Sequence, residues 1–141
     1  MALKVYRLSE SDELSLPVYS SQVSAGFPSP ADDYLEGRLD LNAHLIQNKE
    51  ATFIVRASGD SMQGAGIFDH DLLLVDRSLT PVSGNVIIAC VQGELLVKRL
   101  HIQNGCYQLL AENPAYAPIK LHKSDDFLVW GVVIHVIHKL C

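Results

Sequence analysis

The sequence predicts a mainly β protein, with a twisted, largely antiparallel sheet, an extended N-terminal arm and one short helix. Short apolar stretches bounded by turn-forming residues recur through the second two thirds of the chain, which is typical of strands. No long helical pattern separates them, which argues against parallel βαβ units. We expect strands near residues 52–57, 71–76, 85–91, 94–101, 106–111 and 127–138, with Gln92-Gly93 as a hairpin turn.

The first part of the chain lacks this strand pattern. Residues 1–30 show no sustained apolar periodicity and are predicted to form a mobile or loosely docked arm, with residues 31–141 as the folded domain. The segment 34–47 spaces its leucines as a helix does, and Asp32 or Asp33 stands near its start, where helices favour a capping side chain. We therefore expect the short helix there.

Composition limits the class of protein. The chain has 141 residues, 48% of them hydrophobic, and a formal net charge of −5. This length supports one core. Its three cysteines, Cys90, Cys106 and Cys141, lack paired spacing, which indicates a reducing compartment. No apolar run reaches the roughly 18 to 20 residues of a membrane span, and the start is unlike a secretory signal, so a cytoplasmic location without membrane attachment is expected.

Ser61 and Lys98 have the pattern of a nucleophile and its general base. Ser61 follows an apolar, strand-like segment, and Lys98 lies inside a second apolar stretch. A serine hydroxyl needs a neighbour to take its proton, and a lysine can do so only when its amine is neutral. Alternation along a strand would place Lys98 between Leu96 and Leu100, where burial lowers a lysine pKa. The adjacent Arg99 would stay charged in the same setting.

A candidate substrate bond for this dyad lies in the arm. Ala25 and Gly26 are followed by Pro28 and Pro30, which favour an extended backbone. Peptidases cut extended chain; Ala25 fits a shallow pocket before the bond, and Gly26 lets a nucleophile approach closely. A plain proline-containing linker is the alternative interpretation of the same residues.

Two other kinds of site are open from the residues present. Asp69-His70-Asp71 follows Ser61 and offers a Ser-His-Asp triad, although the same residues ahead of an apolar strand more simply predict a polar turn. His135 and His138, with Cys141, suggest a metal site, but residues three apart on a strand point to opposite faces. We therefore expect neither a metal nor another cofactor.

Several ordered motifs give the chain its likeness to a known family. They are Ala25-Gly26 with Phe27-Pro28-Ser29-Pro30, Gly59-Asp60-Ser61-Met62, Asp69 to Asp76, Val97-Lys98-Arg99-Leu100, Asn113 to Ile119, and Trp130 to Val136. With them the chain resembles the LexA/UmuD family of self-cleaving, S24-type serine peptidases from about residue 24 to its end. The resemblance implies that Ser61 and Lys98 form the catalytic dyad and that this dyad cuts the Ala25–Gly26 bond.

Within this family the chain resembles the UmuD-like branch. Only 25 residues precede Gly26, too few for the winged helix-turn-helix domain of a repressor, and they hold few basic residues. The resemblance implies an SOS DNA-damage-response protein that forms a homodimer and cleaves itself when stimulated by the RecA nucleoprotein filament. Its product would then act in translesion synthesis as the accessory subunit of an error-prone, UmuC-like Y-family polymerase. We expect no sequence-specific DNA binding.

Two alternative functions stay open. One is a fragment of a LexA-like self-cleaving transcriptional repressor. The other is a soluble signal-peptidase-like protease, because bacterial signal peptidases also use a Ser-Met pair and a downstream lysine.

Overall fold

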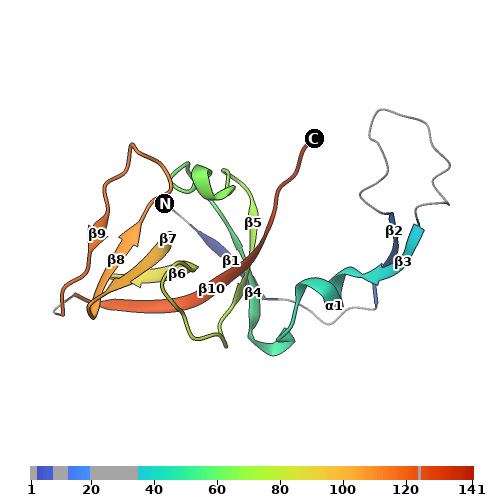
Figure 1. The fold of residues 1–141 in the computed structure, drawn as a ribbon, viewed down its shortest axis with the longest axis horizontal. Helices are drawn as coiled ribbons and strands as arrows, with labels where there is room; N and C mark the ends of the chain where they lie inside the picture. Colours follow the sequence, from blue (N-terminus) through green and yellow to red (C-terminus); the bar gives the residue numbers. More distant parts are fainter. Residues whose placement is uncertain (1–2, 8–12, 20–34, 124) are drawn as a thin grey trace. The chain divides into compact units, whose positions relative to one another are not determined.

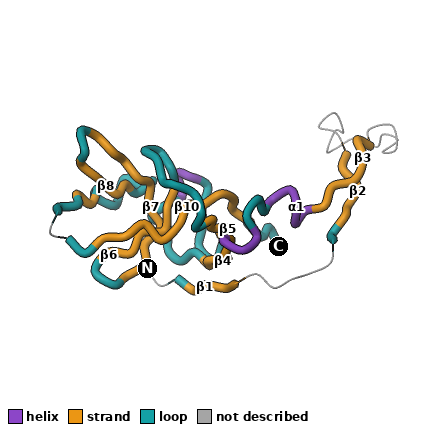
Figure 2. Tube along the Cα trace, turned by 90° about the horizontal axis from the view of Figure 1, so that it is seen from below, coloured by secondary structure: helices purple, strands orange, loops and turns teal. Residues whose placement is uncertain are grey.

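The computed structural model describes residues 3–7, 13–19, 35–123 and 125–141. The chain divides into two compact units, a large one of Met1–Leu8 with Asn48–Cys141 and a small one of Ser9–Gln47. Among the described residues, strands dominate both units, and helix is confined to short segments (Figure 2). The prediction of a mainly β, antiparallel fold with one short α-helix is confirmed.

The large unit is built on one eight-stranded sheet in the order β1-β4-β5-β10-β6-β7-β8-β9 (Figure 1). Every adjacent pair in it is antiparallel. Two 3-10 turns, Lys49–Ala51 and Gln63–Ala65, flank β4. The strands are β1 Lys4–Arg7, β4 Thr52–Arg56, β5 Leu72–Asp76, β6 Val86–Val91, β7 Glu94–Gln103, β8 Cys106–Leu110, β9 Ile119–Lys120 and β10 Phe127–Ile137.

The strands expected after residue 50 are all present within one or two residues of their predicted bounds. The turn at Gln92-Gly93 is confirmed: both residues have positive φ, 50° and 79°, as a tight turn between two twisted antiparallel strands requires. This turn aligns β7 with β6, so that Lys98 lies opposite Ile87.

Strand β10 joins the two halves of the sheet and divides the core. Its first part pairs with β6 and its second part with β5, and the register shifts on each side, between Val129 and Gly131 and between Val133 and His135. A Cβ at Gly131 would lie 2.5 Å from Val75 Cγ1, so only glycine fits this crossing. The first core cluster contains Val55, Ala57, Met62, Ile67, Leu73, Val75, Ile88 and Val97; the second contains Ile87, Ala89, Leu100, Leu109 and Val132.

In the small unit, the prediction of a helix over residues 34–47 is wrong for most of its length. Its first part is a strand, β3 (Leu35–Asp40), paired with β2 (Ser15–Tyr19), and only α1 (Leu41–Leu45) is helical. Gly37 has φ 137°, which is outside the helical region, and Leu39 lies opposite Leu16 instead of facing the next helical turn. The helix is capped by the Asp40 carboxylate, which accepts the Asn42 N–H at 3.0 Å.

Within the arm predicted over residues 1–30, the described part forms two short strands, which its lack of apolar periodicity did not predict. β1 pairs with β4, and β2 pairs with β3. Both strands are short and largely exposed, so their partners, not their own periodicity, stabilise them. Ala25 and Gly26 lie outside the described residues, and the boundary near residue 30 stays a prediction. Among the described residues, no helix is long and apolar enough to cross a membrane.

Candidate active site

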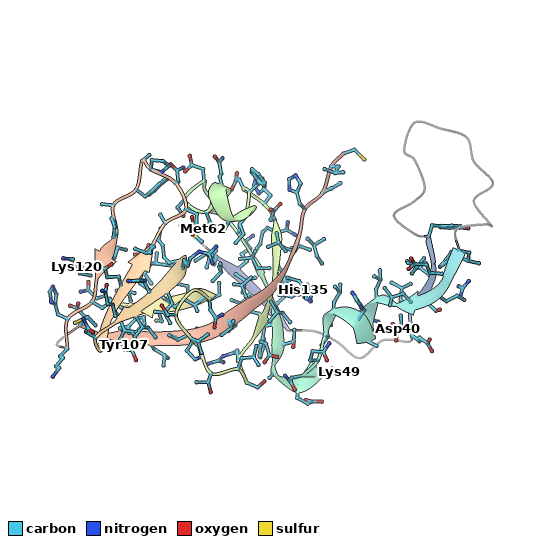
Figure 3. The ribbon with its side chains drawn as sticks, in the orientation of Figure 1. Asp40, Lys49, Met62, Tyr107, Lys120 and His135 are labelled. Atoms are coloured by element: carbon cyan, nitrogen blue, oxygen red, sulfur yellow. The ribbon has the colours of Figure 1, made fainter. Side chains whose placement is uncertain are left out.

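Ser61 lies in the connection from β4 to the 3-10 turn Gln63–Ala65. Its neighbour Met62, labelled in Figure 3, is buried in the first core cluster and fixes this part of the loop. The loop is further held by the Gly59 N–H, which donates to Asp69 Oδ1 at 2.8 Å. Ser61 itself is only 1% exposed, and its Oγ has no hydrogen-bond partner among the described residues. A buried polar side chain without a protein partner is rare in native structures.

Lys98 lies in the middle of β7 and is 8% exposed, which confirms the predicted burial of its side chain. The residue opposite it, Ile87, is fully buried, as is Leu100 two positions along the strand. Loss of water around the amine lowers the pKa of Lys98 below its usual 10.5, because burial disfavours the charged form. The environment therefore weakens the charged form of the amine, a change in the direction that a general base requires.

The segment Glu112–Tyr116 is hydrogen-bonded to the loop that carries Ser61. The Glu112 N–H donates to the Ser61 carbonyl at 2.9 Å, and the Gly64 N–H donates to the Glu112 carbonyl at 2.8 Å. The Asn113 side chain donates to the Asp60 carbonyl at 2.9 Å. These three hydrogen bonds attach the serine loop to the segment Glu112–Tyr116.

Tyr116 connects the same loop to Lys98. Its hydroxyl donates to Asp60 Oδ1 at 2.5 Å, and its ring centre lies 5.3 Å from Lys98 Nζ. The hydrogen bond to Asp60, followed by the negative charge of that carboxylate, raises the pKa of Tyr116. One side chain thus touches both the residue before Ser61 and the candidate base.

The structure places Ser61 and Lys98 in the same unit and links them through Tyr116, but in the described part of the chain they share no hydrogen bond. Catalytic hydrogen bonds are often long or unformed before the substrate binds. The site therefore combines a buried serine hydroxyl without a described partner and a buried lysine whose ammonium form is destabilised.

The histidine alternative gains no support from the geometry. Asp69 and His70 form the polar turn that was predicted; His70 has φ 71°, and its side chain is 79% exposed. Asp71 is buried and pairs instead with His138, with 2.5 Å between Oδ1 and Nδ1.

Among the described residues, no group of three or more His, Cys, Asp or Glu side chains is arranged to hold a metal ion.

Glu112 and Tyr116 were not predicted to have a role. The motif Asn113 to Ile119 contributed to the family resemblance, but its sequence contains no sign of which side chain would touch Ser61 or Lys98. Tyr116 is 56 residues from Asp60, and only the folded sheet brings them together.

Replacing Gly64 with alanine is expected to loosen the serine loop. The new Cβ would lie 2.7 Å from the Glu112 carbonyl oxygen, so the loop and the segment Glu112–Tyr116 must separate. Overpacking of this kind costs about 1–3 kcal/mol, which urea unfolding would measure as a lower midpoint at an unchanged slope. Gln63→Ala, at the exposed neighbouring position, is the control and should leave the midpoint unchanged.

Comparison with known proteins decides the family. The sequence model of the Peptidase S24-like family matches residues 17–134. The chain belongs to this family. It is 42% identical over 134 residues to protein ImpA of Salmonella typhimurium, which covers 91% of this chain and 87% of ImpA. It is also 42% identical over 139 residues to protein SamA of Salmonella typhimurium strain LT2, covering 99% and 96%, and 37% identical over 131 residues to protein MucA of Escherichia coli, covering 90% and 88%. The resemblance to the UmuD-like branch of the S24 peptidases is thereby confirmed.

Proposed function

We propose that this S24 member is an SOS DNA-damage-response protein that cuts its own Ala25–Gly26 bond, with Ser61 as nucleophile and Lys98 as general base. The observation that carries the proposal is the buried Ser61 hydroxyl, which has no partner among the described residues and is linked through Tyr116 to a buried lysine. The family supports peptidase chemistry, and the relatives support a role in SOS mutagenesis.

The proposed reaction has two stages. Neutral Lys98 takes the proton of Ser61 Oγ, and the oxygen attacks the carbonyl carbon of Ala25. Backbone N–H groups beside Ser61 stabilise the oxyanion. The C–N bond to Gly26 then breaks, the Lys98 ammonium gives its proton to the leaving amine, and an ester joins Ala25 to Ser61. Water, deprotonated by Lys98, hydrolyses that ester and restores the serine.

The proposed biological setting follows the UmuD-like relatives. The protein would act as a homodimer, the RecA nucleoprotein filament would stimulate the cut, and the product would join an error-prone, UmuC-like Y-family polymerase. Filament binding would favour the conformation in which the bond is docked at Ser61.

The direct test is mass spectrometry of the purified chain after incubation with an activated RecA filament. The expected result is a new species with the mass of residues 26–141, absent from the Ser61→Ala variant. An unchanged mass in both proteins, or the same cut in both, would refute the proposal. Co-purification with the polymerase, and a mutagenesis assay in cells lacking the endogenous subunit, then test the role of the product.

Replacing Gly26 with valine is expected to block cleavage, although Ser61 and Lys98 are untouched. A branched side chain after the scissile carbonyl would collide with the attacking serine or force the chain out of its extended path. Ser29→Val introduces the same branched side chain three residues further on and is the control, which should still be cut. Cleavage of Gly26→Val at the same position and rate would show that the scissile bond lies elsewhere.

A further inference from the structure

The outer edge of β4 is covered by β1. The proposed cut at Ala25–Gly26 lies between these two strands in the sequence. β4 pairs with β5 along its whole length, and β1 occupies its opposite edge (Figure 1). The register is antiparallel, with Val5 opposite Val55 and Tyr6 opposite Ile54. β1 ends the sheet, so the described part of the chain continues no further on that side.

The described side chains of β1 contribute little to its attachment to this edge. Val5 is 39% exposed and Tyr6 is 46% exposed. Leu3, just ahead of the strand, is half-buried and packs against the first core cluster. The attachment therefore depends mainly on backbone hydrogen bonds to β4 and on one apolar anchor.

Strand β2, which also lies before the proposed cut, likewise pairs with a strand that lies after it. β2 pairs with β3 in a separate two-stranded sheet, and Ala25–Gly26 lies in the connection between them. A two-stranded hairpin is marginally stable even when its connection is intact. Cutting the bond would therefore separate β1 and β2 covalently from the strands that they pair with.

We propose that the edge of β4 opposite β5 is a strand-accepting site. This chain's own Leu3–Arg7 fills the site while the chain is intact. The opening of the site by cleavage rests on the proposed function, whereas the site itself does not. Once open, it would take an extended peptide segment of the same kind, antiparallel to β4, with an apolar side chain at the Leu3 position. Addition of a strand to a sheet edge is a common mode of peptide recognition.

Loss of the covalent link between β1 and β4 explains how a cut at Ala25–Gly26 would expose the edge of β4, which lies far from it in the sequence. A tethered segment competes for its site at an effective concentration on the order of millimolar, whereas a separate peptide competes only at its own concentration. A strand of four residues with one apolar anchor is a weak ligand at micromolar concentration. β4 would keep its conformation, because β5 pairs with it throughout and Val55 is fully buried.

The test uses the full chain with Ser61→Ala, so that no cleavage occurs. Successive N–H groups of an edge strand alternate between the neighbouring strand and solvent, so the double substitution Val5→Pro and Tyr6→Pro removes a donor to β4. The matched control is Val5→Thr with Tyr6→Thr, which changes the same side chains and keeps both N–H groups. Each protein is titrated with a fluorescent peptide of residues 1–8, and amide exchange is followed across β4.

The proline variant is expected to bind the peptide at least tenfold more tightly than the threonine control, and its β4 amides should exchange faster until peptide is added. Equal binding by both proteins, or none by the proline variant, would overturn the proposal, as would loss of protection in β6 and β7. None of these readings depends on peptidase activity. If the natural chain, with Ser61 in place, fails to cleave itself with the RecA filament while the proline variant binds the peptide as expected, the proposed function is refuted and the strand-accepting edge is not.

Discussion

Replacing Lys98 with arginine is expected to abolish self-cleavage as completely as replacing Ser61 with alanine. Arginine keeps the positive charge and much of the length of lysine, but its guanidinium does not lose a proton in proteins and cannot act as a base. Loss of a general base lowers a rate by about 100-fold to 10,000-fold. The rate of appearance of the 26–141 product, measured by mass spectrometry at several pH values, gives the comparison.

Two further variants define what this result means. Lys120→Arg makes the same change at an exposed position on β9 and should cleave normally. Normal processing in Lys98→Arg, or in a double variant lacking both Lys98 and His70, would remove lysine from the mechanism. Processing lost in a His70→Ala variant would instead revive the histidine base.

Raising the pH is expected to accelerate spontaneous cleavage without the RecA filament. The neutral fraction of Lys98 grows about tenfold per pH unit below its pKa and levels off above it. Because burial lowers that pKa, the plateau should begin below pH 10.5, the usual lysine value. The measurement is the cleavage rate from neutral pH towards 10, with circular dichroism to show that the protein stays folded.

The same shift has a consequence for stability that must be separated from the rate. The folded chain holds the Lys98 proton less tightly than the unfolded chain does, so below the folded pKa the buried ammonium is a cost, which fades as the pH rises towards 10.5. On this account alone, stability and rate both increase with pH. A flat rate in protein that remains folded would contradict the role of lysine deprotonation, whatever the change in stability.

The sheet after residue 50 was predictable because its strands alternate or are continuously apolar and end at strong turn residues. The pair Gln92-Gly93 adopts positive φ at both positions, and this local requirement is visible in the sequence. Burial of Lys98 was predictable for the same reason, since the residues on its own face of β7, Leu96 and Leu100, are both leucines.

The described residues among the first 47 were less predictable because their strands depend on partners distant in the sequence. Leu35 and Leu39 are spaced for a helix, but pairing with β2 stabilises a strand, and helix begins only after the Asp40 cap. The strand formed by Lys4–Arg7 has no pattern of its own and requires the edge of β4. In the site, the role of Tyr116 was hidden because its contacts with Asp60 and Lys98 are set by folding and not by local sequence.

The buried hydroxyl of Ser61, which has no described partner, also affects the stability of the fold. Burying a hydroxyl without a hydrogen bond costs about 1–3 kcal/mol, and alanine at this position would remove that group while leaving little empty space. The Ser61→Ala protein should therefore unfold at a higher temperature than the natural chain. Its failure to cleave would then result from the missing nucleophile and not from a less stable fold. The natural chain would be less stable than this variant because it keeps the serine oxygen that the reaction requires.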